Sequence, residues 1–300
     1  MAKLEVIRAF VVVAKHGNLR DAADELGRTQ SALSMSLRQF EQALGGPLFE
    51  TDRKRDLTDL GKFVRDIGEN LISENDRVQD LIYRYAKGQS GQLRIASVPS
   101  VGMLILPELI LRFMESHSDA KIDLMDSDST NVRTMVEAGN ADLGIAGPAP
   151  TGQGLLAMPL FVDRLHVVCP MNSPLAQKKV PLVWQDLLDA PLIANQTLLV
   201  LKNAEARDIV ANSKLSVRNI ASLFAMIESG MGITVLPGLA TRSLSKWLVA
   251  IPLAGHGNTR TISLLSRGDR TASPLASAFR DTLRKDFTEI VARYDLALPQ

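Results

Sequence analysis

The chain has 300 residues, of which 46% are apolar and 22% charged, and its formal net charge is +1. This length suits two or three domains, and the apolar share supplies ample material for buried cores. The sequence contains no run of 18 apolar residues and begins with no secretory signal, and its one cysteine, Cys169, excludes an internal disulfide and a multi-cysteine zinc site. We therefore expect a cytoplasmic protein without a membrane partner.

The first segments of the chain show the pattern of a helix-turn-helix. Apolar residues recur at helical spacing over 4–15, and Asn18 is a suitable N-cap for a second helix over 19–26, which ends at Gly27. Thr29 caps a third helix. The apolar face of this third helix is expected to consist of Leu33, Leu37, Phe40 and Leu44. Two short helices separated by a glycine turn predict a helix-turn-helix.

A short extended hairpin with charges at its tip is expected over 47–57, in the position of a wing. Residues 1–88 contain 14 basic and 14 acidic side chains, so their average charge does not indicate nucleic acid binding. Phosphate contact needs a local concentration of positive charge, and the run Arg53-Lys54-Arg55 supplies one.

A long amphipathic helix is predicted from Thr58 to Gly88, about 40 Å in length. Its apolar residues fall on one stripe, which consists of Leu60, Phe63, Ile67, Leu71, Val78, Ile82 and Tyr85. Such a stripe needs a partner surface, and a second copy of the same helix would provide it.

After a linker at 88–91, strands and helices alternate to the end of the chain. The expected strands are 93–98, 121–125, 141–146, 165–169, 191–194, 215–218, 232–236, 249–252 and 261–265. The expected helices are 101–113, with Pro107 starting its second half, 129–138, 183–188, 200–211, 221–229 and 274–293. Two blocks of this alternation predict two parallel-type α/β subdomains.

The sequence from residue 4 to residue 61 resembles the N-terminal domain of the LysR-type transcriptional regulators. The matching residues are Phe10, Ala14, Gly17, Ala22-Ala23, Leu26-Gly27, Thr29 to Ser34, Arg38 to Glu41, Leu44-Gly45, Leu48-Phe49, Leu57-Thr58 and Gly61. A weaker resemblance extends over the rest of the chain through Gly91 to Ile95, Gly139 to Ile145, Gly230 to Ile233 and Leu236-Pro237. The chain departs from the family pattern at Asn18, Ser31, Met35 and Thr51.

The resemblance implies an α/β protein with an N-terminal all-α winged helix-turn-helix, a long linker helix and a C-terminal two-lobed effector domain similar to periplasmic binding proteins. The expected domains are 1–60 for DNA binding, 61–88 for the dimerisation helix and 91–300 for effector binding, with lobe I at 91–160 and 256–300 and lobe II at 161–255. It also implies a homotetramer built as a dimer of dimers, which bends promoter DNA and contacts RNA polymerase.

The candidate DNA contacts lie on the polar face of the third helix and around it. Opposite its apolar face are Gln30, Ser31, Ser34, Met35 and Arg38. Gln30 suits adenine, Ser34 a base or a phosphate, and Met35 a thymine methyl group. The remaining candidates are Arg28, Thr29, Arg53, Lys54 and Arg55, for backbone phosphate or the minor groove. The alternative is a solvated helix face and an ordinary charged turn.

The candidate effector contacts lie where strands end and helices begin, which is where open α/β sheets bind ligands. In the first lobe they are Ser100, Val101, Ser129 and Thr130, and in the second lobe Asn195, Gln196, Thr197 and Asn219. Hydroxyl groups together with free backbone N–H groups favour an anionic group such as a carboxylate. The alternative is that these side chains only cap helices.

Other functions are weighed against this one. The sequence lacks a nucleophile elbow, a phosphate-binding loop and a His-Glu-x-x-His pair, so we expect no enzyme, cofactor or metal. A solute-binding module without a role in transcription and a repressor that needs no ligand remain alternatives. Cys169 and His166, both in an apolar strand, are expected to be structural, and the branch of the resembling family that senses peroxide is excluded because it needs two cysteines.

Overall fold

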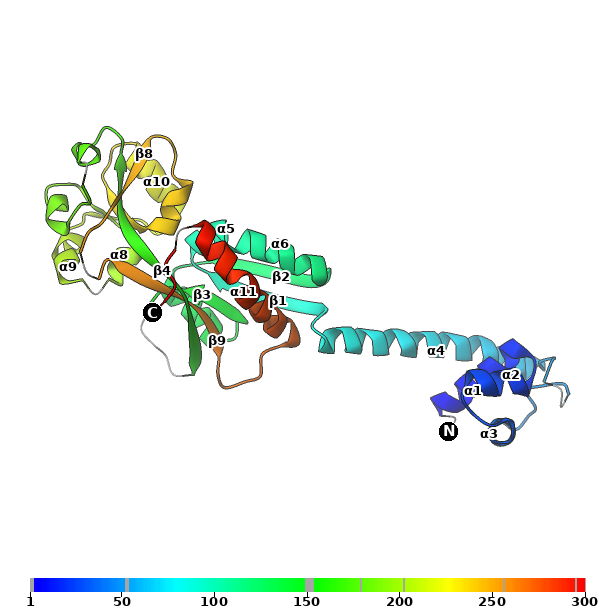
Figure 1. Cartoon of the computed structure of the whole chain (residues 1–300). Coiled ribbons are helices and arrows are strands. Elements are labelled where there is room, and N and C mark those ends of the chain that lie inside the picture. The colour runs from blue at the N-terminus through cyan, green and yellow to red at the C-terminus, as the bar shows by residue number, and fades with distance from the viewer. Residues whose placement is uncertain are drawn as a thin grey trace. The chain divides into compact units, whose positions relative to one another are not determined.

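The computed structural model describes residues 3–51, 54–148, 154–178, 180–201, 203–255, 257–294 and 296–299. The chain divides into two compact units, Met1–Arg84 and Tyr85–Gln300. The first unit is helical and the second combines strands with helices (Figure 1). Within the described ranges, no helix has both the length and the apolar character that a membrane crossing requires.

The first unit consists of α1 (Leu4–His16), α2 (Leu19–Glu25), α3 (Gln30–Leu44) and most of α4 (Asp59–Ala86). The two predicted N-caps are confirmed, because Asn18 Oδ1 accepts a hydrogen bond from the Asp21 amide and Thr29 Oγ1 accepts one from the Ala32 amide. The core closes around Phe10, whose ring lies edge-on to those of Phe40 and Phe49. Leu44 was expected in this core but is 41% exposed, since it lies in the last turn of α3.

The segment between α3 and α4 is less regular than the predicted hairpin. In the described parts of this segment, 45–51 and 54–58, the strand pairing is one isolated antiparallel bridge between Phe49 and Leu57. The segment packs tightly against the start of α4, where a Cβ on Gly61 would lie 2.0 Å from the Leu48 carbonyl oxygen. Glycine is therefore required at this crossing for steric reasons.

The predicted stripe of α4 is exposed in the single chain. It comprises Leu60, Phe63, Ile67, Leu71, Val78, Ile82 and Tyr85, which are between 36% and 63% exposed. A different side of α4 packs on α1, where Gly68 leaves room for Ile7 and Val11. Apolar side chains in such a row on a long helix indicate an unpartnered surface.

The second unit is built on one mixed sheet with the strand order β2-β1-β3-β9-β4-β7, in which β8 also pairs with β4, and on the small parallel pair β5-β6. The strands are β1 (Ser90–Ser97), β2 (Asp119–Asp126), β3 (Leu143–Ala146), β4 (Leu155–Pro170), β5 (Ile193–Ala194), β6 (Leu215–Ser216), β7 (Thr234–Pro237), β8 (Leu248–Pro252) and β9 (Thr259–Arg267). The helices are α5 (Pro99–Leu104), α6 (Leu106–Ser116), α7 (Ser129–Glu137), α8 (Gln196–Leu199), α9 (Ala204–Ala211), α10 (Ile220–Glu228) and α11 (Pro274–Arg293), with short 3-10 turns η1 (Pro174–Gln177), η2 (Trp184–Leu187) and η3 (Gly238–Ser243).

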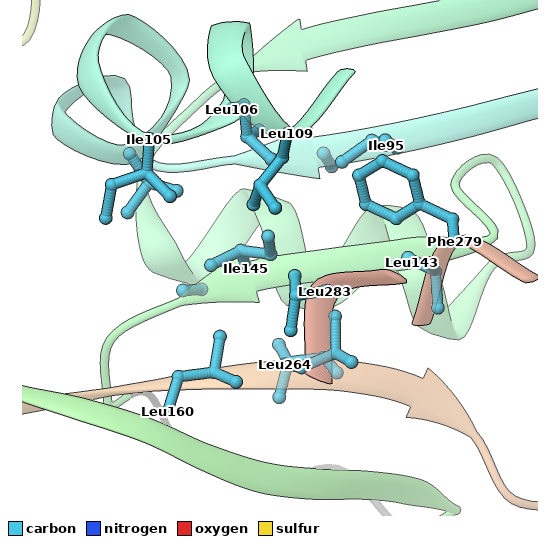
Figure 2. Packing of buried hydrophobic residues seen from close by; sticks show 14 of the residues in the cluster. Ile95, Ile105, Leu106, Leu109, Leu143, Ile145, Leu160, Leu264, Phe279 and Leu283 are labelled. Carbon is cyan, nitrogen blue, oxygen red and sulfur yellow. The ribbon is translucent and has the colours of Figure 1, made fainter. Parts of the chain in front are cut away.

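The first lobe has helices on both faces of its sheet. Leu143 and Ile145 of β3 lie in the cluster formed with Phe279 and Leu283 of α11 and with residues of α6 (Figure 2). Gly144, between them, faces the other side, where a Cβ would lie 2.7 Å from Val136 of α7. Alternation along one strand thus places α7 opposite α6 and α11.

The second lobe contains α8, α9 and α10 around β7, β8 and the last part of β4 (Figure 1). The expectation of two parallel subdomains is wrong here, because β4 pairs antiparallel with β7, β8 and β9. β4 also begins ten residues earlier than predicted, at Leu155, and runs through both lobes. The predicted helix over 101–113 is two helices, with the break at Ile105.

Candidate DNA-binding helix and effector cleft

The helix α3 presents a polar edge to solvent and an apolar edge to the core of the first unit. Leu33, Leu37 and Phe40 are at most 5% exposed. On the other edge Gln30, Ser31, Met35 and Arg38 are exposed and Ser34 is half-buried. The five side chains selected from the sequence are therefore brought together on one accessible face.

Arg28 and Thr29, which precede this face, differ in whether their side chains are already used in hydrogen bonds. Arg28 is exposed, and the structure shows no hydrogen bond between its side chain and another described residue. Thr29 uses its hydroxyl to cap α3, accepting the Ala32 amide at 3.2 Å, and the same oxygen lies 3.2 Å from Ser31 Oγ. Thr29 thus holds the first turn of α3 in place, which orients the residues that follow.

The described basic residues of the wing, Lys54 and Arg55, differ in their exposure to solvent. Arg53 lies outside the described residues. Lys54 has a left-handed backbone with φ of 60°, and its ammonium lies 3.7 Å from Glu41 and 4.8 Å from the centre of the Phe49 ring. Its side chain is only 12% exposed, so it is directed inward rather than outward as expected. Arg55 is exposed and remains the accessible cation of the described wing.

A cavity of about 1320 Å³ lies between the two lobes of the second unit. Six of the candidates from the sequence line it, namely Ser100, Ser129, Thr130, Asn195, Gln196 and Thr197. Val101 does not line the cavity because its side chain is buried in the core of the first lobe. Asn219 does not line it either, and its Oδ1 caps α10 by accepting the amides of Ala221 and Ser222.

The start of α7 is closed by its own N-cap, which the sequence reasoning overlooked. Asp128 Oδ1 accepts the amides of Thr130 and Asn131, each at 3.0 Å. The hydroxyl of Ser129 accepts the Gly147 amide at 3.0 Å. Two of the backbone donors at this helix start, those of Thr130 and Asn131, are therefore already paired with a carboxylate.

Asn195 reaches the cavity wall but is committed to the fold. It is 5% exposed, its amide group donates to Thr234 Oγ1 and the Val235 carbonyl, and its Oδ1 caps α8. The next residue, Gln196, is half-buried, and its Nε2 lies 3.5 Å from Asp128 Oδ2 of the first lobe. This contact joins the two lobes at the edge of the cavity.

A buried ion pair lies where the chain crosses between the lobes. Asp163 of β4 and Arg260 of β9 are register partners in the antiparallel ladder, and Arg260 Nη2 donates to Asp163 Oδ2 at 3.3 Å and to Ser100 Oγ at 2.8 Å. The side chains are 1% and 11% exposed. Arg260 lines the cavity directly.

Burial determines the protonation behaviour of this pair. It raises the pKa of Asp163, because removing the carboxylate from water disfavours its charged form, and the nearby Arg260 charge and Leu239 amide oppose this effect. Burial lowers the pKa of Arg260 for the converse reason. The guanidinium nevertheless remains a cation, because arginine is not deprotonated in proteins.

Sequence reasoning did not select Asp163 or Arg260. Asp163 could have been found, since one carboxylate inside an apolar strand signals a buried charge that needs a partner. Arg260 could not be distinguished from Arg267 or Arg270, because only the register of β9 against β4 brings it to the cavity. Asp128 was overlooked although an aspartate before a helix is a common cap.

Of the two residues expected to be structural in the second lobe, Cys169 lies in the core and His166 lies partly exposed at its edge. Cys169 is fully buried in its core, and burial raises the pKa of its thiol. His166 is half-buried, and its Nδ1 lies 3.3 Å from the Arg164 carbonyl oxygen.

A helix-turn-helix unit with an exposed recognition face, followed by a two-lobed domain with a large cavity between its lobes, defines a class of protein, the ligand-responsive transcription regulators. Comparison with known proteins makes the class specific. The model for the bacterial regulatory helix-turn-helix protein, lysR family, matches residues 4–62, and that for the LysR substrate binding domain matches residues 86–288. The chain belongs to the LysR family, whose members are DNA-binding transcriptional regulators with an effector-binding domain.

Relatives and solved structures agree with this assignment over nearly the whole chain. The HTH-type transcriptional regulator YbhD of Escherichia coli K12 is 28% identical over 92% of this chain and 89% of its own length. The hydrogen peroxide-inducible genes activator of Haemophilus influenzae is 26% identical, with coverages of 90% and 91%. The LysR regulator CbnR has a similar fold, with a TM-score of 0.74 at 19% identity over 94% of this chain and all of that one, and 0.73 at 18% identity, over 95% and 99%, when CbnR is bound to its target DNA.

Proposed function

We propose that the exposed edge of α3 reads bases in the major groove and that a small anionic molecule bound between the lobes modulates this activity. The observation that carries the proposal is the division of α3 into a fully buried apolar edge and an accessible edge containing Gln30, Met35 and Arg38. A helix held in this way can enter a groove as one rigid face. Gln30 suits adenine, Ser34 a base or a phosphate, and Met35 a thymine methyl group.

Phosphate contacts come from exposed cations beside this helix. Arg28 at its start and Arg55 in the wing are the described residues that suit this role, and Arg53 belongs with them by its place in the sequence. Lys54 contributes less because it is held by Glu41. The effector contacts are proposed at Ser100, Ser129, Thr130, Gln196 and Thr197, which line the cavity and carry polar side chains.

We propose that the protein acts in the cytoplasm as a homotetramer, a dimer of dimers. The exposed stripe of α4 supports one of the two pairing surfaces, because apolar rows on a long helix are stable in water only when covered. Two helix-turn-helix units would then meet two half-sites of a near-palindrome. Effector binding would change the closure of the lobes, and with it DNA bending and contact with RNA polymerase.

The test is the affinity of the full-length protein for the region upstream of its own gene, measured by fluorescence anisotropy at several salt concentrations. We expect tight binding to this DNA and weak binding to a shuffled duplex of equal length. Gln30→Ala should cost about 1–3 kcal/mol on the natural site and much less on the shuffled one. Equal, weak binding to both duplexes would contradict the proposal and favour a solute-binding module.

The same assay tests the effector. Addition of small carboxylates and amino acids should shift the affinity for the upstream DNA. Tight binding that no metabolite alters would indicate a repressor that needs no ligand.

A further inference from the structure

One wall of the cavity carries a guanidinium group and a hydroxyl group, the groups that bind anions. Arg260 lines the cavity, and its Nη2 bonds to Ser100 Oγ and to Asp163 Oδ2. Its Nε is buried and finds no hydrogen-bond acceptor in the described part of the chain. A buried guanidinium N–H without an acceptor costs free energy, so the fold leaves the donors of Arg260 incompletely satisfied.

Asp163 occupies only part of the capacity of this guanidinium. The bond between Arg260 Nη2 and Asp163 Oδ2 is single and long, at 3.3 Å, whereas a carboxylate that engages the guanidinium edge makes two parallel bonds of about 2.8 Å. Asp163 Oδ1 and Oδ2 also accept the Leu239 amide, at 3.2 and 3.4 Å. Asp163 therefore neutralises the charge of Arg260 without satisfying its donors.

A second wall of the same cavity carries a carboxylate group. Asp128 lines the cavity, and its Oδ1 accepts the amides of Thr130 and Asn131 at the start of α7. Its Oδ2 accepts Asn131 Nδ2 at 3.0 Å and faces Gln196 Nε2 at 3.5 Å. A second anion at this place would meet a like charge, whereas an ammonium or N–H group of a ligand would be attracted.

We propose that Arg260 and Ser100 bind the carboxylate of an effector that carries one acidic group and whose other polar groups are hydrogen-bond donors. Amino acids are the simplest members of this class, and dicarboxylates are disfavoured by Asp128. The inference rests on the proposed function, since it assumes that the cavity holds the effector. It names the chemical class of that effector and the residue that selects it.

The affinity of single compounds for the full-length protein tests this assignment. The probes are acetate, L-alanine, L-glutamine and succinate, each up to about 50 mM at constant ionic strength, with thermal unfolding as the readout. A ligand at ten times its dissociation constant raises the unfolding midpoint of a domain of this size by about 3 °C. We expect this shift with at least one monocarboxylate and a much smaller shift with succinate.

Variants identify the residue responsible. Arg260→Gln should lower the affinity for the stabilising monocarboxylate at least tenfold. Arg218→Gln is the matched control, because Arg218 also lines the cavity but is exposed, and it should change the affinity less than twofold. Asp163→Asn should raise the affinity, since it removes the carboxylate that competes for Arg260, a gain that a purely structural pair would not produce. The double variant R260Q/D163N leaves no unpaired buried charge and should still fold and fail to bind.

The outcomes separate this inference from the proposed function. Equal losses in Arg260→Gln and Arg218→Gln, or weaker binding in Asp163→Asn, would overturn the role of Arg260. Release of promoter DNA by succinate, or by a compound without a carboxylate, would overturn the assigned effector class while leaving effector control intact. DNA binding that no compound alters would refute effector control itself.

Discussion

Arg260 and Asp163 stand opposite each other on β9 and β4, at the point where the chain crosses between the two lobes, and form an almost completely buried ion pair. Because both residues are fixed by the ladder, the pair links the wall of the cavity to β9 and to β4, the strand that runs through both lobes. A charge placed there is costly unless it is compensated, and loss of one partner leaves the other uncompensated.

Arg260→Gln should therefore destabilise the second unit by about 3–5 kcal/mol at pH 7. The loss should shrink at pH 5. Burial already raises the pKa of Asp163, and removal of Arg260 raises it further, so the folded state takes up a proton more readily than the unfolded state. Part of the stability lost in Arg260→Gln is then regained as the pH falls through the folded-state pKa of Asp163, and it is lost again as the pH rises through that pKa.

Urea unfolding followed by tryptophan fluorescence measures this effect, because Trp184 and Trp247 both lie in the second unit. Arg218→Gln is the control and should show the pH dependence of the unchanged protein. An equal loss of unfolding free energy in Arg260→Gln at pH 7 and at pH 5 would show that Asp163 is not the titrating group.

The inward direction of Lys54 predicts unequal roles for two neighbouring cations of the wing. Arg55→Ala should reduce the slope of log affinity against log salt concentration by about 0.9, as expected for the loss of one phosphate contact. Lys54→Ala should leave this slope nearly unchanged because Lys54 is paired with Glu41. Anisotropy titrations across a salt series measure the slope for each variant. A reduction of about 0.9 in Lys54→Ala would mean that its ammonium reaches DNA.

Two glycines of α4 should differ in their tolerance of a methyl group. In Gly61→Ala the Cβ would meet the Leu48 carbonyl oxygen at 2.0 Å, so the backbone itself must move, and we expect a loss of about 2–3 kcal/mol and weaker DNA binding. In Gly68→Ala the neighbours are the side-chain methyl groups of Ile7 and Val11, which can shift, and the cost should be about 1 kcal/mol. Equal losses by circular dichroism melting would contradict this difference.

The exposed stripe of α4 should govern assembly. Ile82 is 63% exposed, and Ile82→Glu places a charge in the stripe, so light scattering after size exclusion should show a smaller oligomer. Glu69→Lys changes an exposed polar residue of the same helix and is the control. An unchanged mass in Ile82→Glu would show that the stripe does not form a subunit interface.

Cys169 should be unreactive in the folded protein. It is fully buried, and burial raises the pKa of its thiol, which lowers the share of reactive thiolate at any given pH. Iodoacetamide at pH 8 should leave the native chain unmodified and add one label after unfolding in urea, as mass spectrometry would show. Rapid labelling of the native protein would instead indicate an accessible, reactive thiol.

Much of the fold was predictable because its signals are local. Helical periodicity and the caps Asn18 and Thr29 located the first three helices, and the apolar stripe located α4. The mixed sheet was not predictable in the same way. The direction in which β4 runs against its neighbours depends on partners more than 60 residues away, which no local pattern encodes.

The sequence by itself determined the family, the exposed face of α3 and six of the polar residues around the cleft, because these follow from motif, spacing and the ends of strands. Only the tertiary structure decided which of those residues are free. Asn195 and the amides at the start of α7 are consumed by caps, while Arg260 is carried to the cavity by its register with Asp163. Hydrogen-bond donors and charges are allocated by whatever the folded chain brings within reach, and that depends on long-range packing.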